Sequence, residues 1–190
     1  MIKKFEELLL STKREGVEAL LEFIRKSDFY TAPASTKYHS CHEGGLLEHS
    51  LNVYECLKEK RKNPIWENAL KDIPEESFII SALLHDICKC YLYKVDYRNK
   101  KNDDTGVWEK VPYYTIDDRI PYGHGEKSVM MVEEYIKLTP VERYGIRWHM
   151  LWTEPKELYN TVGNAIKKYP FVMAMHQADL EATYLMEKEE

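Results

Sequence analysis

The sequence lacks any apolar run long enough to cross a membrane. Its longest such stretches, for example residues 169–175, fall far short of the ~20 residues that a membrane-spanning helix requires. Near the N-terminus, Glu6 and Glu7 stand where a secretory signal peptide needs an unbroken apolar region. We therefore expect a cytoplasmic protein with no membrane partner.

An excess of positive charge is also missing. The chain has 27 Lys and Arg residues against 32 Asp and Glu residues, for a formal net charge of −5. Proteins that bind nucleic acid through bulk charge need a basic face to neutralise phosphates, so nucleic acid is the less favoured partner. A small phosphorylated substrate needs only a few local cations and remains compatible with this balance.

Cysteine is scarce, and no CxxC pair is present. The four cysteines, Cys41, Cys56, Cys88 and Cys90, are most simply reduced thiols, most of them buried. Cys88 and Cys90 flank one lysine, but a C-x-C pair alone is weak evidence for a metal site, and we expect a structural role. Interdomain linkers and internal repeats are absent too, and 44% of the 190 residues are hydrophobic. The chain is therefore expected to form a single domain over residues 1–190.

Apolar residues recur with helical spacing over most of the chain. Before residue 91 this pattern predicts several helices, with a loop at residues 29–40 and a helix that opens at Gly44 and Gly45. After residue 122 it predicts helices at residues 123–138, 140–152, 155–168 and 170–190. Residues 91–122 instead form two β-rich runs joined at residues 102–106, which indicates a hairpin. The predicted fold is all-α, a bundle of roughly seven or eight helices with this β-hairpin inserted at about residues 91–122.

Histidine is the most informative residue type in the sequence. His85 and Asp86 stand together in ALLHDICK, at the end of an apolar helix. An imidazole and a carboxylate buried side by side are costly unless each has a ligand or a hydrogen-bond partner. His49 follows two glycines in GGLLEHS, and Asp179 stands in HQADLEAT on another apolar helix. The pattern points to a shared polar site inside the helical bundle.

These residues, in this order, resemble the HD-domain superfamily of metal-dependent phosphohydrolases. The resemblance covers about residues 39–185, nearly the whole chain. GGLLEHS is also similar to the HD domain of certain bacterial 3′–5′ exoribonucleases, and the full pattern with the hairpin and GHGEKS resembles a group of stand-alone bacterial and phage HD proteins. Cys88 departs from the glycine that many members carry (HDIGK), and we expect it to alter packing rather than ligation.

The resemblance implies an HD fold and two sets of metal ligands. The first metal would be held by His49, His85, Asp86 and Asp179. The second would be held by Asp86, His124 and His149. A mixed nitrogen and oxygen set suits one or two divalent transition metals (Fe, Mn, Ni, Co or Zn) better than Mg. Asp86 would bridge the two ions, and a metal-activated water would attack phosphorus.

Cationic side chains near these motifs are candidates for substrate contact. Lys89 lies three residues after Asp86, so it is expected to share that helix face and to contact the phosphate as a catalytic and substrate-binding residue. Lys127 repeats this spacing after His124 and is either a substrate contact or a solvated lysine. Arg147 is expected at the solvent surface.

Three further histidines are left with open roles. His39 and His42 precede the glycine pair, and they either line the substrate entrance or only cap the loop. His176 lies three residues before Asp179 and is either a core histidine or a support for the site.

The predicted function is hydrolysis of a phosphomonoester or phosphodiester, with a nucleotide as the expected substrate. One alternative is an exonuclease-like diesterase acting on short single-stranded nucleic acid, and another is a non-catalytic HD regulatory module. The hairpin is predicted to be a lid or wall with packed aromatic stems and a mobile polar tip. Four of its aromatic residues are candidates for stacking on a base: Tyr93, Tyr97, Trp108 and Tyr114.

Overall fold

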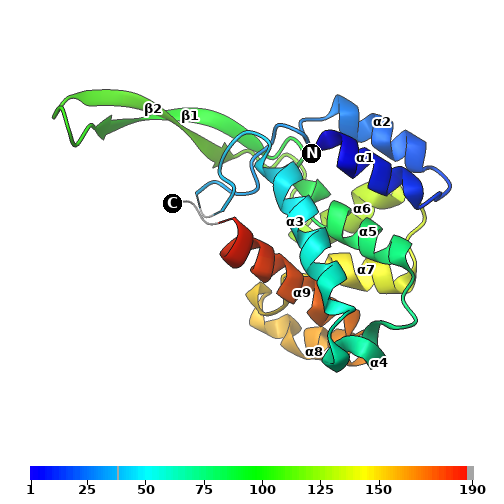
Figure 1. The fold of residues 1–190 in the computed structure, drawn as a ribbon. Coiled ribbons are helices and arrows are strands. Elements are labelled where there is room, and N and C mark those ends of the chain that lie inside the picture. Colours follow the sequence, from blue (N-terminus) through cyan, green and yellow to red (C-terminus); the bar gives the residue numbers. More distant parts are fainter. Residues whose placement is uncertain (38, 188–190) are drawn as a thin grey trace.

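The computed structural model describes residues 1–37 and 39–187. Before the hairpin, these residues form the helices α1 (Ile2–Ser11), α2 (Val17–Lys26), α3 (Gly45–Lys60), α4 (Glu67–Leu70) and α5 (Glu75–Leu84). After it come α6 (His124–Glu133), α7 (Pro140–Arg147), α8 (Tyr159–Lys168) and α9 (Phe171–Glu181). Short 3-10 turns lie at Pro64–Trp66, Ile87–Lys89, Leu151–Thr153 and Lys156–Leu158, and a π-helical turn at Ala182–Met186 follows α9. The described part is therefore mostly helical, as predicted (Figure 1).

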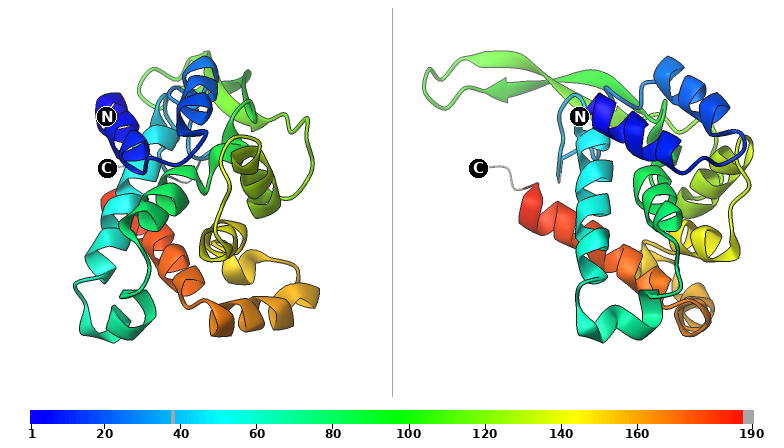
Figure 2. Two further views of the ribbon diagram at one scale, coloured as in Figure 1. Left: turned by 90° about the vertical axis from the view of Figure 1, so that its right-hand side faces the viewer. Right: turned by 45° about the vertical axis from the view of Figure 1, so that its right-hand side comes forward.

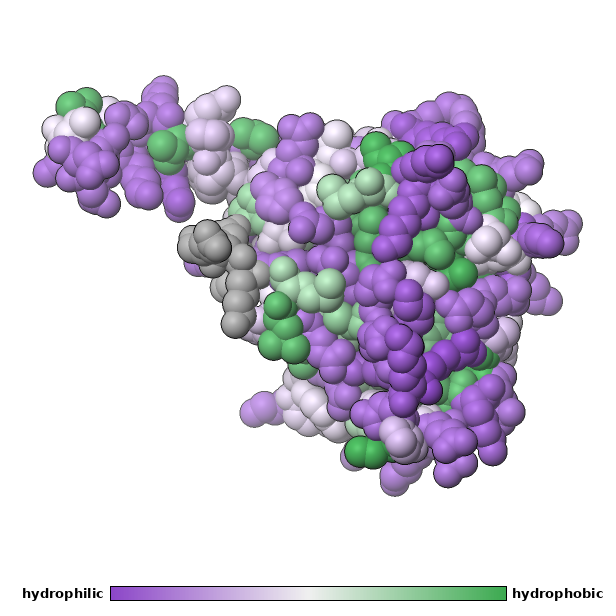
Figure 3. Space-filling view, in the orientation of Figure 1, coloured by the Kyte–Doolittle hydropathy of each residue, from purple (hydrophilic) through white to green (hydrophobic). Residues whose placement is uncertain are grey.

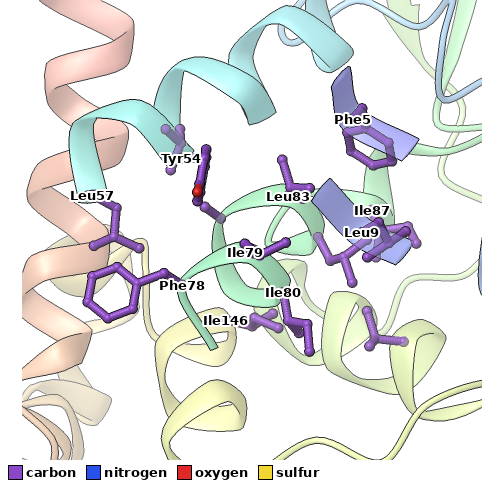
Figure 4. Close-up of a cluster of buried hydrophobic side chains, with 14 of the residues drawn as sticks. Phe5, Leu9, Tyr54, Leu57, Phe78, Ile79, Ile80, Leu83, Ile87 and Ile146 are labelled. Atoms are coloured by element: carbon purple, nitrogen blue, oxygen red, sulfur yellow. The ribbon is translucent and has the colours of Figure 1, made fainter. Parts of the chain in front are cut away.

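Helix α5 lies at the centre of the bundle. It packs against α1, α3 and α7, and every residue from Ser77 to Leu84 is buried. A helix that is apolar on all sides is stable only when other elements surround it, and α5 meets this condition. Figure 4 shows its Phe78, Ile79 and Leu83 among side chains from the neighbouring helices. The residues directly after α5 therefore lie in the interior of the protein.

Several predicted helices are longer than those observed. The predicted helix 123–138 ends at Glu133, and Thr139, in an extended conformation, caps the next helix through a capping box with Glu142. The predicted helix 140–152 ends at Arg147, and Leu151 has a φ of 41°, which a regular helix does not contain. The predicted helix 155–168 begins as a 3-10 turn, and the helix predicted for 170–190 continues from α9 into a π-helical turn. Residue 38 of the predicted loop and residues 188–190 of that last helix lie outside the described residues.

The hairpin forms at the predicted place. Strands β1 (Tyr93–Lys101) and β2 (Trp108–Ile116) pair antiparallel, from Tyr93 opposite Ile116 to Lys101 opposite Trp108. The two-stranded ribbon projects beyond the helices, as Figure 1 and the right-hand view of Figure 2 show. On the face drawn in Figure 3, most of its surface is hydrophilic.

The prediction that the aromatic stems pack is wrong for most of the ribbon. The side chains of Tyr97 and Trp108 are 62% and 68% exposed, because no helix accompanies the strands away from the bundle. Partial cover is found mainly toward the base of the hairpin, where the Tyr93 hydroxyl donates to the carbonyl of Ala34.

Among the residues that the structure describes, no helix combines the length and the apolar character needed to cross a membrane.

Candidate metal centre

The end of α5 places two candidate ligands at the centre of the bundle. His85 and Asp86 follow Leu84 directly, and their exposed fractions are 0% and 2%. His49 reaches the same region from α3. Two glycines allow this helix to start close to the preceding loop: Gly44 has a φ of 81°, and a Cβ on Gly45 would lie 2.0 Å from the carbonyl oxygen of Ser40. The GGLLEHS motif thus has a steric explanation.

The other histidines arrive where α6 begins and where α7 ends. His124 is the first residue of α6, and His149 follows the last residue of α7 by two positions. A Cβ on Gly125 would lie 2.2 Å from the carbonyl oxygen of Arg147, so only glycine permits the two helix ends to meet this closely. As a result, the ring centres of His124 and His149 are 5.1 Å apart.

Asp86 is the hub of the cluster. Its Oδ1 lies 2.8 Å from Nε2 of His124 and 3.7 Å from Nε2 of His149. Its Oδ2 lies 3.4 Å from Nε2 of His85 and 3.7 Å from Nε2 of His49. Each carboxylate oxygen therefore faces a different pair of imidazoles.

Asp179 on α9 completes the cluster on the side of His49. Its Oδ1 lies 3.1 Å from Nε2 of His49. The side chains of Asp179 and His124 are 15% and 34% exposed, whereas those of His49, His85, Asp86 and His149 are at most 3% exposed. Solvent therefore reaches the cluster beside His124 and, to a smaller extent, beside Asp179. The six residues predicted as ligands converge at one place.

The histidine rings are held from their far sides. Three of them use Nδ1 for a hydrogen bond directed away from Asp86: His85 to the carbonyl of Ala82 at 2.8 Å, His149 to the carbonyl of Ile146 at 2.7 Å, and His49 to the carboxylate of Glu187 at 3.0 Å. When Nδ1 carries the proton, the lone pair of a neutral imidazole is on Nε2 and faces Asp86. This is the usual arrangement of histidines that bind a metal.

Two of the Nε2 atoms that face Asp86 lack a hydrogen-bond partner among the described residues. Nε2 of His85 and Nε2 of His149 are buried and have no hydrogen-bond partner among the described residues. Leaving a buried polar atom unpaired is costly, and a metal ion at this place would satisfy both nitrogens. The cluster therefore fits a bound cation.

Electrostatics separate the ligands into two kinds. Burial, together with the positive charges of His85 and His124, lowers the pKa of His149 to about 3, so this ring stays neutral. Burial also lowers the pKa of His49, but hydrogen bonds to Asp179 and Glu187 outweigh it and raise the value to about 9. His149 is ready to bind a metal at neutral pH, whereas His49 must first release a proton.

Charged neighbours also shift the pKa values of the two carboxylates and of His124. For Asp86, the charges of Lys89 and the neighbouring histidines outweigh the effect of burial and hold the pKa well below its usual range. For Asp179, the hydrogen bond to His49 outweighs burial and likewise lowers the pKa. Burial lowers the pKa of His124, but the charge of Asp86 outweighs this effect and raises the pKa to about 10. Both carboxylates are ionised and available as oxygen ligands.

The donor set indicates which metals the site could hold. Overlapping groups of three side chains bring their ligand atoms within 4.8 Å of one another: His49, His85 and Asp179; His85, Asp86 and His149; Asp86, Cys88 and His124. Imidazole nitrogens mixed with carboxylate oxygens suit Mn, Fe, Co, Ni or Zn, whereas Mg prefers oxygen throughout. The chemistry of the residues present therefore fits a transition metal.

Lys89 lies beside Asp86, as predicted, but the two residues do not share a helix face. Because α5 ends at Leu84, Lys89 belongs to the 3-10 turn Ile87–Lys89 and does not share an α-helical face with Asp86. Its Nζ nevertheless lies 2.6 Å from Oδ2 of Asp86 and donates to the carbonyl of Ala34 at 2.6 Å. Although burial opposes it, the charge of Asp86 raises the pKa of Lys89, so the ammonium stays charged.

The structure places Lys127 and His42 outside the cluster. Nζ of Lys127 pairs with Oδ1 of Asp118 at 2.8 Å, so the lysine fastens the segment that leads from the hairpin to α6. His42 is exposed, and its Nε2 lies 3.3 Å from Oε2 of Glu48. Substrate contact by Lys127 would require the ion pair with Asp118 to break.

Arg147 is not the solvated surface residue that was expected. Its side chain is 15% exposed, forms ion pairs with Glu126 and Glu154, and lies over the ring of Trp148 at 3.8 Å. The guanidinium therefore fastens the end of α7 to α6 and to the following turn. The expectation is wrong because the sequence does not reveal these two carboxylate partners.

Three residues next to the candidate ligands were missed or given another role. Glu187 binds His49, and it gave no signal because it stands in a charged C-terminal run. Sγ of Cys88 lies 3.3 Å from Nδ1 of His124, and its position two residues after Asp86 was the available signal. His39, whose role was open, lies with its ring centre 4.9 Å from that of His49.

His176 contacts the cluster from behind. Its Nδ1 lies 2.6 Å from the backbone carbonyl oxygen of His149. This contact holds the segment that carries His149, which favours a supporting role over that of a simple core histidine.

Comparison with known proteins yields one significant similarity. Over 62 residues the chain is 39% identical to a dihydroneopterin 2′,3′-cyclic phosphate phosphodiesterase of Methanocaldococcus jannaschii. The match covers 33% of this chain and 24% of the relative, so the chain spans about a quarter of the length of the protein it resembles. No family model matches the sequence, and no solved structure gives a significant match. The similarity supports a phosphohydrolase.

Proposed function

We propose that this protein is an HD-type metal-dependent phosphohydrolase that acts on a small phosphorylated substrate, with a nucleotide as the first candidate. The observation that carries the proposal is the arrangement around Asp86, where four Nε2 atoms face one carboxylate. The similarity to a phosphodiesterase over part of the chain supports the same class of reaction.

The two oxygens of Asp86 support a division of the ligands between two metal ions. Oδ2 faces His49 and His85, and Asp179 lies on that side; Oδ1 faces His124 and His149. We propose that the first group holds one ion, the second group holds another, and Asp86 contributes to both. Bound metal would supply Lewis-acid polarisation of a phosphoryl oxygen and lower the pKa of water.

Lys89 is proposed to bind the phosphate. Its ammonium is held at Oδ2 of Asp86 and at the carbonyl of Ala34, which leaves one of its three N–H donors for a substrate oxygen. Held in this position, the cation would stabilise negative charge that develops on the phosphoryl group.

A cavity at the base of the hairpin is a candidate place for the rest of the substrate. It has a volume of about 560 Å³, and its lining includes His42, Arg98, Tyr113 and Tyr114. Residues 39–42 connect this cavity to the candidate centre, since the ring of His39 lies against that of His49. Cationic and aromatic side chains suit a phosphorylated molecule that carries a ring.

A hydrolysis panel tests the proposal. Purified protein would be incubated with nucleoside monophosphates, 2′,3′-cyclic and 3′,5′-cyclic phosphodiesters and short single-stranded RNA, with Mn, Fe, Co, Ni, Zn or Mg added back. We expect hydrolysis of a small ester that depends on a transition metal and is lost in Asp86→Ala. Asp72→Ala is the matched control, because Asp72 is an exposed carboxylate in the connection before α5. Cleavage of RNA alone would support the exonuclease-like alternative, and a protein that binds no metal and cleaves nothing would support the regulatory module.

A further inference from the structure

Glu187 is a buried carboxylate that no part of the proposed reaction uses. Its Oε2 accepts a hydrogen bond from the hydroxyl of Ser40 at 2.9 Å, and its Oε1 accepts one from Nδ2 of Asn52 at 3.1 Å. Both oxygens also lie within 3.1 Å of Nδ1 of His49. The side chain is only 1% exposed, so the C-terminal segment directs a charge inward to three polar partners.

His49 differs from the other buried histidines in where its ring is anchored. His85 and His149 donate to Ala82 and Ile146, carbonyls in the last turns of α5 and α7. The last four carbonyls of a helix have no intrahelical partner, so these acceptors are free.

His49, in contrast, lies inside α3, where the backbone carbonyls are already engaged. The equivalent carbonyl, three residues earlier, belongs to Leu46, and it accepts a hydrogen bond from the hydroxyl of Ser50 at 2.8 Å. A histidine at this position therefore needs an acceptor from another segment of the chain, and Glu187 provides it.

We propose that Glu187 is a positioning residue that keeps the proton of His49 on Nδ1 and directs Nε2 toward the candidate metal centre. Ser40 and Asn52 hold the carboxylate in place, so its orientation does not depend on His49 alone. A carboxylate behind a metal-binding imidazole fixes the ring, selects its tautomer and makes it a better donor. This inference rests on the proposed function, because it takes His49 as a metal ligand.

The test uses the full chain loaded with Zn²⁺, which is diamagnetic. Nitrogen-15 NMR of the histidine rings should show the His49 proton on Nδ1 and the metal on Nε2. Zn²⁺ affinity, measured by competition with a chelator, should fall about 10–100-fold in Glu187→Ala. Glu187→Gln retains a side-chain oxygen that can accept the hydrogen bond, so it should recover most of this loss. Glu181→Ala should bind Zn²⁺ as the wild type does, because Glu181 lies on the same C-terminal segment but pairs with Lys60.

The outcomes distinguish this inference from the proposed function. If Zn²⁺ does not bind His49 in the wild type, the proposed function fails and the inference fails with it. If Zn²⁺ binds Nε2 of His49 but Nδ1 carries no proton, or Glu187→Ala binds Zn²⁺ as tightly as the wild type, only the role of Glu187 is overturned. The wild-type spectrum decides the matter even if Glu187→Ala does not fold.

Discussion

Nζ of Lys89 lies 2.6 Å from Oδ2 of Asp86, and this contact joins the proposed phosphate-binding cation to the proposed bridging ligand. The two residues are close in space, but the account gives them different tasks. Asp86 would hold metal, whereas Lys89 would meet the negative charge of the substrate.

This division predicts different losses for the two alanine variants. Asp86→Ala should lower the metal content and abolish hydrolysis, because it removes both a ligand and its negative charge. Lys89→Ala should keep the metal and slow hydrolysis by about 10²–10³-fold, the usual effect of losing one preorganised contact. Elemental analysis and initial rates on the same preparations measure both effects. Equal metal loss in the two variants would contradict the proposed roles.

The number of bound ions should depend on His149. If two ions bind, His149→Ala should reduce the metal content by about one ion per chain and leave the side of His49 and Asp179 occupied. His42→Ala is the matched control for metal content, because His42 is an exposed histidine that lies outside the cluster. Mass spectrometry of the intact, metal-loaded protein gives the count. A wild type that binds one ion, with His149→Ala unchanged, would show a mononuclear site.

Metal binding should strengthen as the pH rises. The pKa values of His49, about 9, and His124, about 10, lie above the ordinary histidine value of 6.5 in the metal-free protein, so both rings are charged at pH 7. A metal must displace these protons, and its apparent affinity should therefore increase with pH until it levels off near pH 9–10. His149, with a pKa of about 3, contributes no proton.

Calorimetry in buffers of different ionisation enthalpy measures the protons released at pH 7. We expect about two protons for each chain that fills both proposed positions. Affinity that does not change between pH 6 and pH 9 would show that these two histidines are not ligands.

The same pKa shifts predict how the stability of the metal-free protein depends on pH. For His49 and His124, the folded pKa is raised above the unfolded value, so their contribution is complete below about pH 6.5 and is lost as the pH rises through 9–10. Urea unfolding of the chelator-treated protein should show a loss of stability that begins above about pH 6.5 and continues to about pH 10, and saturating Zn²⁺ should reverse its direction. A free energy of unfolding that stays constant from pH 7 to pH 10 would contradict the predicted coupling.

Shortening the hairpin tip should alter substrate choice and spare the chemistry. Residues 102–106 connect the far ends of β1 and β2, which project beyond the helices (Figure 2). Along the chain, Lys89 precedes β1 and His124 follows β2, so both lie outside the ribbon. Replacing the tip with a two-residue turn should leave the metal content and the hydrolysis of a small generic ester nearly unchanged. The relative rates on larger nucleotides should change. Loss of metal in this variant would mean that the hairpin supports the scaffold of the site.

Sequence patterns predict best those features that depend only on the residues of one helix or one turn. The apolar residues of α5 identify a buried helix, and residues 102–106 identify the turn of the hairpin. The convergence of His49, the His85–Asp86 pair and Asp179 could be anticipated only through the family resemblance, because their spacing along the chain does not bring them together.

Features that depend on a distant partner could not be predicted. Glu187 lies in a charged run that is typical of a solvated terminus, and only the fold shows that it binds His49. The spacing of Lys127 after His124 is compatible with a substrate contact, and only the fold shows that Lys127 pairs with Asp118. The exposure of the hairpin stems could not be predicted either, because a pattern of alternating aromatic residues does not show whether another element covers them.

The central claim is that metal binds around Asp86, and anomalous diffraction from crystals of the full chain soaked in Mn²⁺ or Zn²⁺ tests it most directly. The account predicts anomalous peaks between Asp86 and the Nε2 atoms of the surrounding histidines, at about 2.0–2.2 Å from those nitrogens for Zn²⁺. Two peaks about 3.5–4 Å apart, on opposite sides of the Asp86 carboxylate, would match the proposed pair of ions. Crystals that bind these metals only at surface residues, with no peak beside Asp86, would contradict the account.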